Sequence, residues 1–405
     1  MTAGEARRAA ERAARQSYGK LVAILSARTR DVAAAEDALA DAFRSALQTW
    51  PERGVPDRPE AWLITAARRS LGHVARHARV VDAGQAMLEM LAHDDEMVEI
   101  PDQRLALLFI CAHPAIDRAV QAPLMLQTVL GLDAQRIAAC FLTSPAAMGQ
   151  RLVRAKAKIR DAGIAFAVPD RDALPARLDA VLSAIYAAYG TGWEDVHDAE
   201  PRGKGLAEEA LWLARVVVGL LPASAEARGL LALMLHCEAR RPARRDGEGC
   251  FVPLDRQDPS RWRADMIAEA EAILASAGRM GRPGRFQIEA AIQSVHAARA
   301  RTGATNWPAL VALYDHLAEL APAVGVLVAR AAATAAAGDP AAAIVQLDGI
   351  GDRRYQPWWA ARARALTLLG RHPEAAEAFA TAAGLTEDAA VRAYLLAQIS
   401  VSPPA

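Results

Sequence analysis

Apolar residues recur every three or four positions through most of this 405-residue chain. This spacing places them on one face of a helix, and the alternation of apolar and polar residues that is typical of a strand is nearly absent. The pattern therefore predicts an all-α protein. In the N-terminal part it divides into helices over about 3–16, 18–29, 31–49 and 61–77. Pro51 is expected to end the third of these, because proline cannot continue a helix.

The helix over 31–49 combines an apolar face with an acidic one. Asp31 is well placed to cap its first turn. Glu36, Asp37 and Asp41 fall together on the polar side. An acidic surface of this kind suits a partner different from the one that a basic surface would bind.

The helix over 61–77 follows a loop of proline, glycine and charged residues at 51–60. Trp62, Ala66 and Ser70 are expected on its inward side. The opposite side carries three basic residues, Arg69, His73 and Arg76. Their spacing lets all three face one strand of nucleic acid. The alternative is an amphipathic surface helix whose arginines are merely solvated.

Residues 132–160 carry the most specific pattern in the chain. Asp133 can cap a short helix, a tight turn follows, and Ser144-Pro145 can begin a second helix that runs to about Arg160. Small residues lie where the two helices would cross, as a helix-turn-helix requires. A plain pair of antiparallel helices is the alternative. The preceding helices are expected over 103–112 and 115–130.

From about Leu174 the pattern continues as short helices separated by Gly, Pro or Asp. Gly338 and Gly370 recur 32 positions apart in similar surroundings, close to the ~34-residue tetratricopeptide period. This predicts an α-solenoid that is similar to tetratricopeptide repeats. The segment 241–262 interrupts the array as a loop or small hairpin, and it is either a contact surface or an ordinary long connection.

Charge changes this picture only when it is counted by segment. The chain has 47 basic and 47 acidic residues, so its net charge is zero, which excludes a uniformly basic nucleic-acid coat. Residues 81–102 contain seven acidic and no basic residues, and residues 135–160 contain six basic and no acidic residues. The first stretch is interpreted as an acidic connector and the second as a basic helical unit, although like-charged runs are often only solvated faces.

The sequence lacks the motifs that are typical of several functional classes. The four cysteines are far apart, the histidines are scattered, and no nucleotide-binding, metalloprotease or nucleophile motif occurs. We expect no enzyme, no cofactor and no metal site, and we expect Cys111 to lie in the core. No apolar run is long enough for a membrane helix and the N-terminus lacks a signal peptide, so a cytoplasmic protein is expected.

Three motifs in order resemble the σ2 and σ4 domains of extracytoplasmic-function (ECF) RNA polymerase sigma factors. They are VAAAEDALADAFRSALQTW, VPDRPEAWLITAARR, and LDAQRIAACF followed by RLVRAKAKIR, and they span about residues 10–165. LFICAHPA and the helical extension are similar to the ECF group with a tetratricopeptide-like extension. The resemblance implies a σ2 domain, an acidic linker, a helix-turn-helix σ4 domain and a helical extension at 1–80, 81–102, 103–168 and 169–405.

The resemblance also implies roles at matching positions. Docking on the β′ clamp of core polymerase falls on Glu36, Asp37, Asp41 and Phe43, and the β flap of core polymerase is a further expected partner. Capture and melting of the promoter −10 element fall on the loop 51–60 and the helix after it, namely Arg53, Arg58, Trp62, Arg68, Arg69, His73 and Arg76. Recognition of the −35 element falls on Ala146, Ala147, Gln150, Arg151 and Arg154, with Lys156 and Lys158 on phosphates.

Two hypotheses follow. The first is a sigma factor that directs promoter-specific transcription initiation and whose extension regulates its activity, in place of a separate anti-sigma factor and in response to a protein partner. The second is a repeat-scaffold interaction protein, in which a degenerate sigma-like part binds polymerase or a regulator without initiating transcription.

Overall fold

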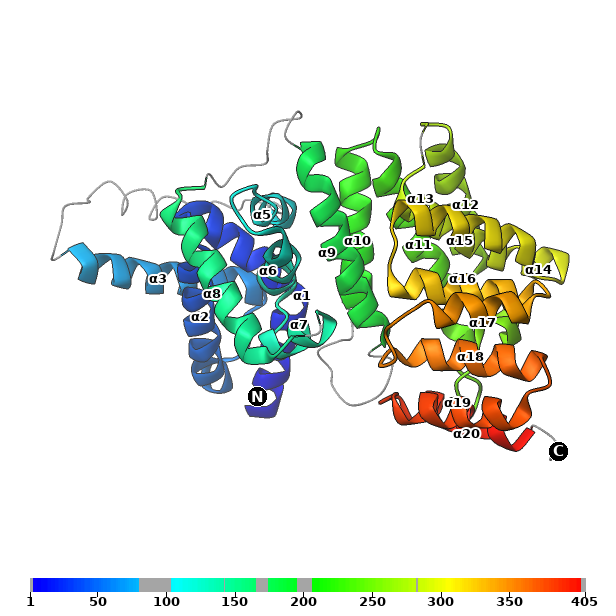
Figure 1. The fold of residues 1–405 in the computed structure, drawn as a ribbon. Coiled ribbons are helices and arrows are strands. Elements are labelled where there is room, and N and C mark those ends of the chain that lie inside the picture. The colour runs from blue at the N-terminus through cyan, green and yellow to red at the C-terminus, as the bar shows by residue number, and fades with distance from the viewer. Residues whose placement is uncertain are drawn as a thin grey trace. The chain divides into compact units, whose positions relative to one another are not determined.

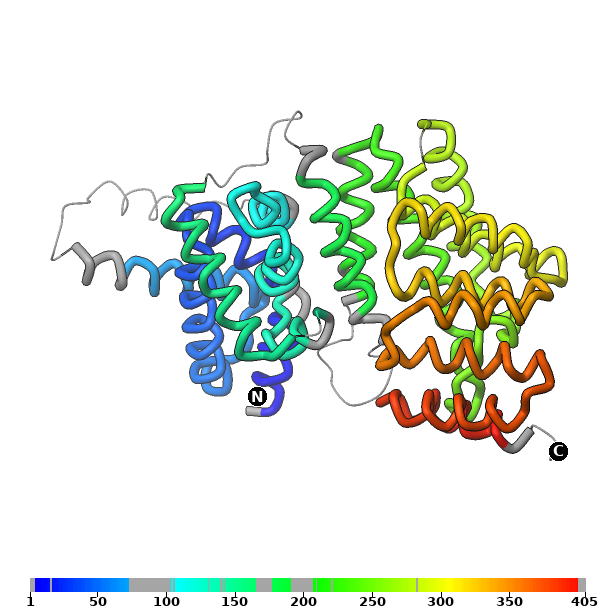
Figure 2. Tube along the Cα trace, viewed as in Figure 1, coloured from blue at the N-terminus to red at the C-terminus, as the bar shows by residue number. Residues whose placement is uncertain are grey.

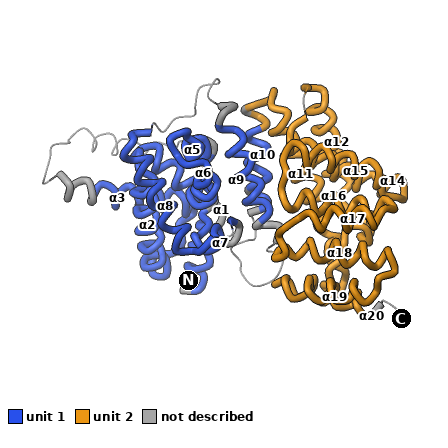
Figure 3. Tube along the Cα trace, in the orientation of Figure 1, with its two compact units in different colours: residues 1–217 blue, residues 218–405 orange. Residues whose placement is uncertain are grey.

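The computed structural model describes residues 3–79, 103–141, 143–164, 174–194, 206–281 and 283–401. Within these ranges the chain forms helices joined by turns and no strand; Arg245 and Phe251 make an isolated bridge (Figure 1). The all-α prediction is confirmed. The predicted acidic connector lies outside the described residues. The chain divides into two compact units, unit 1 at 1–217 and unit 2 at 218–405 (Figure 3).

Unit 1 begins with three helices, α1 (Ala3–Thr29), α2 (Val32–Arg53) and α3 (Pro59–Arg79). The predicted break between 3–16 and 18–29 is wrong, because α1 runs through it. Asp31 caps α2 as expected, its carboxylate accepting a hydrogen bond from the Ala34 amide at 3.1 Å. Pro51 does not end the helix, which continues for a further half turn to Gly54, where a φ of 89° suits glycine.

The second part of unit 1 contains α5 (Arg104–Cys111), α6 (Arg118–Leu130), α7 (Ala134–Cys140) and α8 (Pro145–Asp161). α7 and α8 are the short and long helices predicted from residues 132–160, and they pack against each other. Their predicted caps form, since Asp133 accepts a hydrogen bond from the Arg136 amide and Ser144 from the Ala147 amide.

Two further helices, α9 (Leu174–Glu194) and α10 (Leu206–Leu220), begin the extension. α9 packs on α5 and α6, and Arg177 donates a hydrogen bond to the Phe109 carbonyl oxygen at 3.1 Å. The Arg104 guanidinium lies 4.3 Å from the ring centroid of Trp212 on α10. The start of the extension is therefore packed into unit 1, while the domain limits implied by the sequence stay a prediction.

Unit 2 is a stack of helices: α11 (Ala225–Arg240), α12 (Ala264–Gly278), α13 (Arg285–Ala297), α14 (Arg299–Thr302), α15 (Trp307–Leu320), α16 (Val324–Ala336), α17 (Pro340–Asp348), α18 (Gln356–Leu368), α19 (His372–Gly384) and α20 (Ala389–Val401). Successive helices from α15 to α20 contact one another (Figure 2). Gly338 and Gly370 follow α16 and α18 with φ values of 109° and 71°. The recurring glycines thus mark equivalent turns, because glycine accepts positive φ without strain.

The segment 241–262 joins α11 to α12 and contains three short 3-10 turns, Arg241–Ala243, Leu254–Arg256 and Pro259–Arg261. It contacts the far end of unit 2. Arg364 of α18 pairs with Asp255 at 2.6 Å, and Arg245 pairs with Asp388 before α20 at 2.8 Å. It therefore acts as a strap within unit 2. None of the described helices is long and apolar enough to cross a membrane.

Candidate nucleic-acid and polymerase interface

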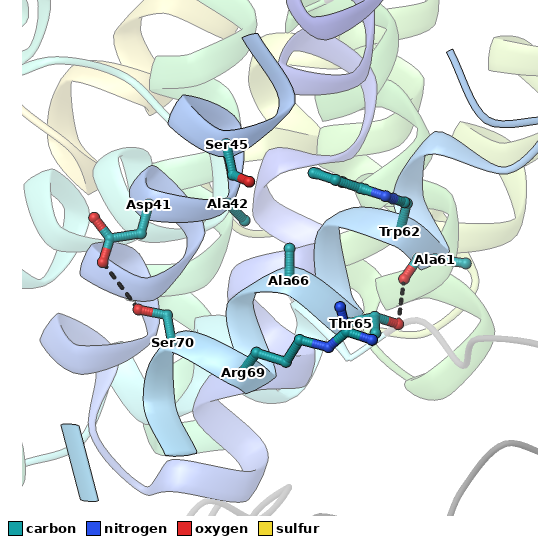
Figure 4. A pocket seen from close by; sticks show the side chains of 9 residues that line it. All are labelled: Asp41, Ala42, Ser45, Ala61, Trp62, Thr65, Ala66, Arg69 and Ser70. Carbon is teal, nitrogen blue, oxygen red and sulfur yellow. Dashed lines mark hydrogen bonds between the residues drawn. The ribbon is translucent and has the colours of Figure 1, made fainter. Parts of the chain in front are cut away.

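A cavity of about 530 Å³ opens between α2 and α3 (Figure 4). It is lined by Asp41, Ala42, Ser45, Ala61, Trp62, Thr65, Ala66, Arg69 and Ser70. Small side chains on both helices leave the space open, with the Trp62 indole at one end and the Arg69 side chain along α3. The cavity combines an aromatic face, several hydroxyl groups, a carboxylate and a guanidinium.

Trp62 is held in place by a second tryptophan. The rings of Trp50 and Trp62 meet edge to face, with centroids 5.5 Å apart and planes at 66°. Trp50 is only 1% exposed, whereas Trp62 is half-buried. The buried partner therefore fixes the indole that faces the cavity.

The predicted orientation of α3 needs correction. Trp62, Ala66 and Ser70 were expected to face the core, and instead they line the cavity. The fully buried positions are their neighbours, Leu63 and Ala67. One residue turns a helix by about 100°, so the periodicity was correct and the rotation was not.

Of the other residues expected at the −10 element whose side chains the structure describes, Arg69 lines this cavity and Arg53, Arg58 and Arg68 do not. Arg53 and Arg58 are exposed at the two ends of the loop, Arg69 is exposed at the cavity, and Arg68 is half-buried. His73 and Arg76 lie in α3, but their side chains are outside the described residues. Ser45 and Thr65 line the cavity but were not predicted from the sequence. Each lies one helical turn from an alanine that also lines the cavity, Ala42 and Ala61 respectively, and this spacing is the signal that could have indicated them.

The acidic residues of α2 do not form one surface. Asp37 is exposed and Phe43 is half-buried. Asp41 accepts hydrogen bonds from Ser70 at 2.9 Å and from Arg44 at 2.8 Å, so it belongs to the cavity. Glu36 points elsewhere, to Lys156 of α8. The expected docking residues therefore divide among three environments.

The basic helix α8 shows the predicted inward face, since Met148, Leu152 and Ile159 are at most 2% exposed. On the outward side the following residues are exposed: Ala146, Gln150, Arg151, Arg154 and Lys158. Ala147 is half-buried at the first turn. Lys156 is the exception, because its side chain is only 12% exposed and is engaged by Glu36.

Burial controls the titration of the groups beneath this surface. Burial raises the pKa of Glu36, and the opposing attraction of Lys156 offsets part of this rise. Burial also raises the pKa of Tyr18, to which the Glu36 charge contributes. Cys111 is fully buried and its pKa rises to about 12, so the expectation that it belongs to the core is confirmed. Among the described residues, no cluster of three or more His, Cys, Asp or Glu side chains could hold a metal ion.

Comparison with known families agrees with this architecture. Residues 13–80, which include α2, α3 and the cavity, match sigma-70 region 2. Residues 177–278 match a family of unknown function (DUF6596). Region 2 interacts with RNA polymerase and promoter DNA in general, so the chain has a sigma-factor-like role. The chain belongs to the family of ECF-like sigma factors that carry a C-terminal extension.

A relative is similar to this chain along nearly its whole length. An uncharacterized protein of Rhizobium meliloti (strain 1021) is 37% identical over 383 residues, which cover 91% of this chain and 90% of that protein. No solved structure matches the chain.

Proposed function

We propose that the protein is a sigma factor that directs promoter-specific transcription initiation by RNA polymerase. The observation that supports this most is the cavity between α2 and α3, within the segment that matches sigma-70 region 2. Its size and lining suit a nucleobase turned out of the DNA stack, which is bound by stacking and by hydrogen bonds to its edge.

Each wall of the cavity has a role in this proposal. The Trp62 ring offers a stacking surface that Trp50 holds in place. Ser45, Thr65 and Asp41 offer hydrogen-bonding groups to the base edge. Arg69, which is exposed at the same site, binds the phosphate of the captured nucleotide. Exposed Arg53 and Arg58 bind the flanking backbone.

The second contact with the promoter is assigned to α8. Its first turns present Ala146, Ala147 and Gln150 to base edges in the major groove, while Arg151 and Arg154 add charge toward the phosphates.

Asp37 and Phe43 on α2 are assigned to the β′ clamp, and the σ4 domain is assigned to the β flap. The catalytic chemistry belongs to the polymerase, so the protein is no enzyme and acts in the cytoplasm. The extension regulates this activity.

The test is transcription in vitro with purified core polymerase and a promoter library. The full chain should yield promoter-dependent transcripts. Trp62→Ala should reduce them by about tenfold or more, because stacking on one aromatic ring contributes about 1–3 kcal/mol per base. Trp62→Phe keeps an aromatic face and should retain most activity. Binding to core polymerase should be unchanged in both variants.

The alternative is a scaffold that binds polymerase without initiating transcription. It is favoured by one observation: Lys156, a residue expected on DNA, is engaged inside the protein. The full chain would then bind core polymerase without yielding a promoter-dependent transcript, from duplex DNA or from DNA melted in advance. That result would support the scaffold and refute the proposal.

A further inference from the structure

The strap, residues 241–262, lies along one face of unit 2. Its residues contact Asp388 before α20, Arg364 of α18 and Arg299 of α14. Because α14 directly follows α13, these partners belong to α13, α18 and α20, which are in the same alternating set of helices as α16. Alternate helices of a stack line the same face, and arrays of stacked helices bind other proteins on such a face. The strap therefore covers a face that could otherwise receive a partner.

The middle of the strap is held only by groups at the surface. The structure describes every residue from 244 to 256, and none of them is buried. The two ends differ, since Ala243 is 1% exposed and Gln257 and Trp262 are 7% and 6% exposed. Ion pairs between partly exposed side chains contribute little to stability. Little free energy therefore holds the middle of the strap against the face, while both ends are anchored.

The groups beneath the strap are held by unit 2 itself. One oxygen of Asp388, Oδ1, accepts hydrogen bonds from two amides in the first turn of α20 at 2.8 and 3.2 Å, while Oδ2 pairs with Arg245 of the strap. Tyr394 packs against the core of the last helices. Its ring meets that of Phe251 edge to face, with centroids 5.5 Å apart. Asp388 and Tyr394 are thus positioned independently of the strap.

The contacts of the strap show which chemistry this face accepts. Asp388 takes a basic group, Tyr394 takes an aromatic ring and Arg364 takes a carboxylate. The strap offers these groups in the order basic, aromatic and acidic, at positions 245, 251 and 255. A segment of another protein with the same order and similar spacing would make the same three contacts.

We propose that the strap is the built-in occupant of a peptide-binding face on unit 2, and that a partner protein displaces it with a segment carrying a basic, an aromatic and an acidic residue in this order. A tethered segment competes as if it were present at about millimolar concentration. Only a partner that binds the uncovered face well below that concentration displaces the strap. This proposal does not depend on the proposed function, because unit 2 lies outside the segment that matches sigma-70 region 2.

The first experiment supplies the strap as a separate peptide. In the full chain, residues 244–256 are replaced by a Gly/Ser linker of equal length, which uncovers the face. A fluorescent peptide of residues 243–257 should bind this linker variant at least tenfold more tightly than the wild type, because the wild-type face is occupied. Fluorescence anisotropy measures the affinity.

Circular dichroism reports whether the linker variant stays folded. Should it not, the milder variant Arg245→Gln with Phe251→Ala, which removes two contacts of the strap, takes its place. A folded variant that binds the peptide no better than the wild type does would overturn the proposal.

Charge exchange tests the contacts on the face. In the linker variant, Arg364→Glu should weaken binding of the peptide by about tenfold, and a peptide that carries Asp255→Arg should restore it. Arg279→Glu, at an exposed position directly after α12, is the matched control and should leave the affinity unchanged. If the exchanged peptide binds Arg364→Glu no better than the original peptide does, the peptide does not take the place of the strap, which contradicts the proposal.

Hydrogen exchange tests whether the strap leaves the face in the wild type. Within the strap the Val252 amide donates a hydrogen bond to the Arg244 carbonyl oxygen at 2.9 Å. The amides of residues 244–256 should nevertheless exchange at least tenfold faster than those of α11 and α18, and an excess of the peptide should accelerate them further. Strap amides that exchange as slowly as those of α11 would show that the strap is a fixed part of the fold, and would overturn the proposal.

Discussion

The arginines of α8 in unit 1 and Arg240 of α11 in unit 2 lie in different environments. In unit 1, Arg151 and Arg154 of α8 are exposed, whereas Lys156 of the same helix pairs with Glu36 of α2, their side chains being 12% and 13% exposed. In unit 2 charged groups lie inside the stack: Arg240 is 7% exposed and donates hydrogen bonds to the His236 carbonyl oxygen and to Gln293. In the proposed function the exposed arginines of α8 bind DNA, whereas the hydrogen bonds of Arg240 stay inside unit 2.

The strap of unit 2 illustrates this difference. Residues 241–262 were interpreted either as a contact surface or as a long connection. Their ion pairs with Arg364 and Asp388 tie the beginning of unit 2 to its last helices. Arg364 and Arg245 are therefore paired within unit 2, whereas Arg151 and Arg154 of α8 stay exposed.

The largest effect should come from unit 1. Gly19→Ala would place a methyl group against the Val129 carbonyl oxygen, and backbone must move to accommodate it. We expect a loss of about 3–4 kcal/mol in the free energy of unfolding of unit 1, measured by urea denaturation of the full chain. Gly149→Ala in α8 meets nothing within 4 Å and should instead stabilise by up to about 1 kcal/mol. Equal effects at both positions would contradict the close approach of α1 and α6.

A smaller effect should distinguish unit 2 by its pH dependence. Burial, with a contribution from Arg240, lowers the pKa of His236 to about 4, although the Glu271 carboxylate lies 3.6 Å from its Nε2. In the unfolded chain the His236 imidazole takes up a proton near pH 6.5, and in the folded chain it does not. Neutral His236 therefore makes its full contribution to the free energy of unfolding above pH 6.5. This contribution is lost as the pH falls to 4, by up to about 3 kcal/mol.

His236→Gln removes this titration and should flatten the pH dependence of unit 2 stability between pH 6.5 and 4. Part of the slope should remain, because burial also lowers the pKa of His296 to about 4. His316, which is exposed, is the control, and His316→Gln should leave the slope as it is. A slope that is equally steep in wild type and His236→Gln would show that folding does not change the pH range over which His236 binds its proton, which contradicts the lowered pKa.

The smallest effect concerns the exposed charges of α8. Arg151→Ala with Arg154→Ala should weaken binding of the holoenzyme to −35 DNA and lower the dependence of log K on log salt by about 2, one for each lost phosphate contact. Arg261→Ala with Arg263→Ala removes two exposed arginines from unit 2 and should leave the slope unchanged. An unchanged slope for the α8 variant would refute its role in DNA binding.

Helix periodicity and capping, which act over a few residues, predicted most of the secondary structure. The caps at Asp31, Asp133 and Ser144 formed where the sequence placed them, because each depends on a side chain and the amide three residues further along the chain. The inward face of α8 was also correct. The continuity of α1 and the passage of α2 through Pro51 were missed, since packing against neighbouring helices can outweigh a local break.

What the sequence determined by itself was the helical class, the helix-capping positions, the inward face of α8 and the motifs that indicated the family. Only the tertiary structure decided the rotation of α3 that turns Trp62 toward a cavity, and the pairing of Lys156 with Glu36. The physical reason is range. Periodicity and capping act over a few residues along the chain, whereas a cavity and a buried ion pair depend on which helices meet, and at what angle, after long loops have closed.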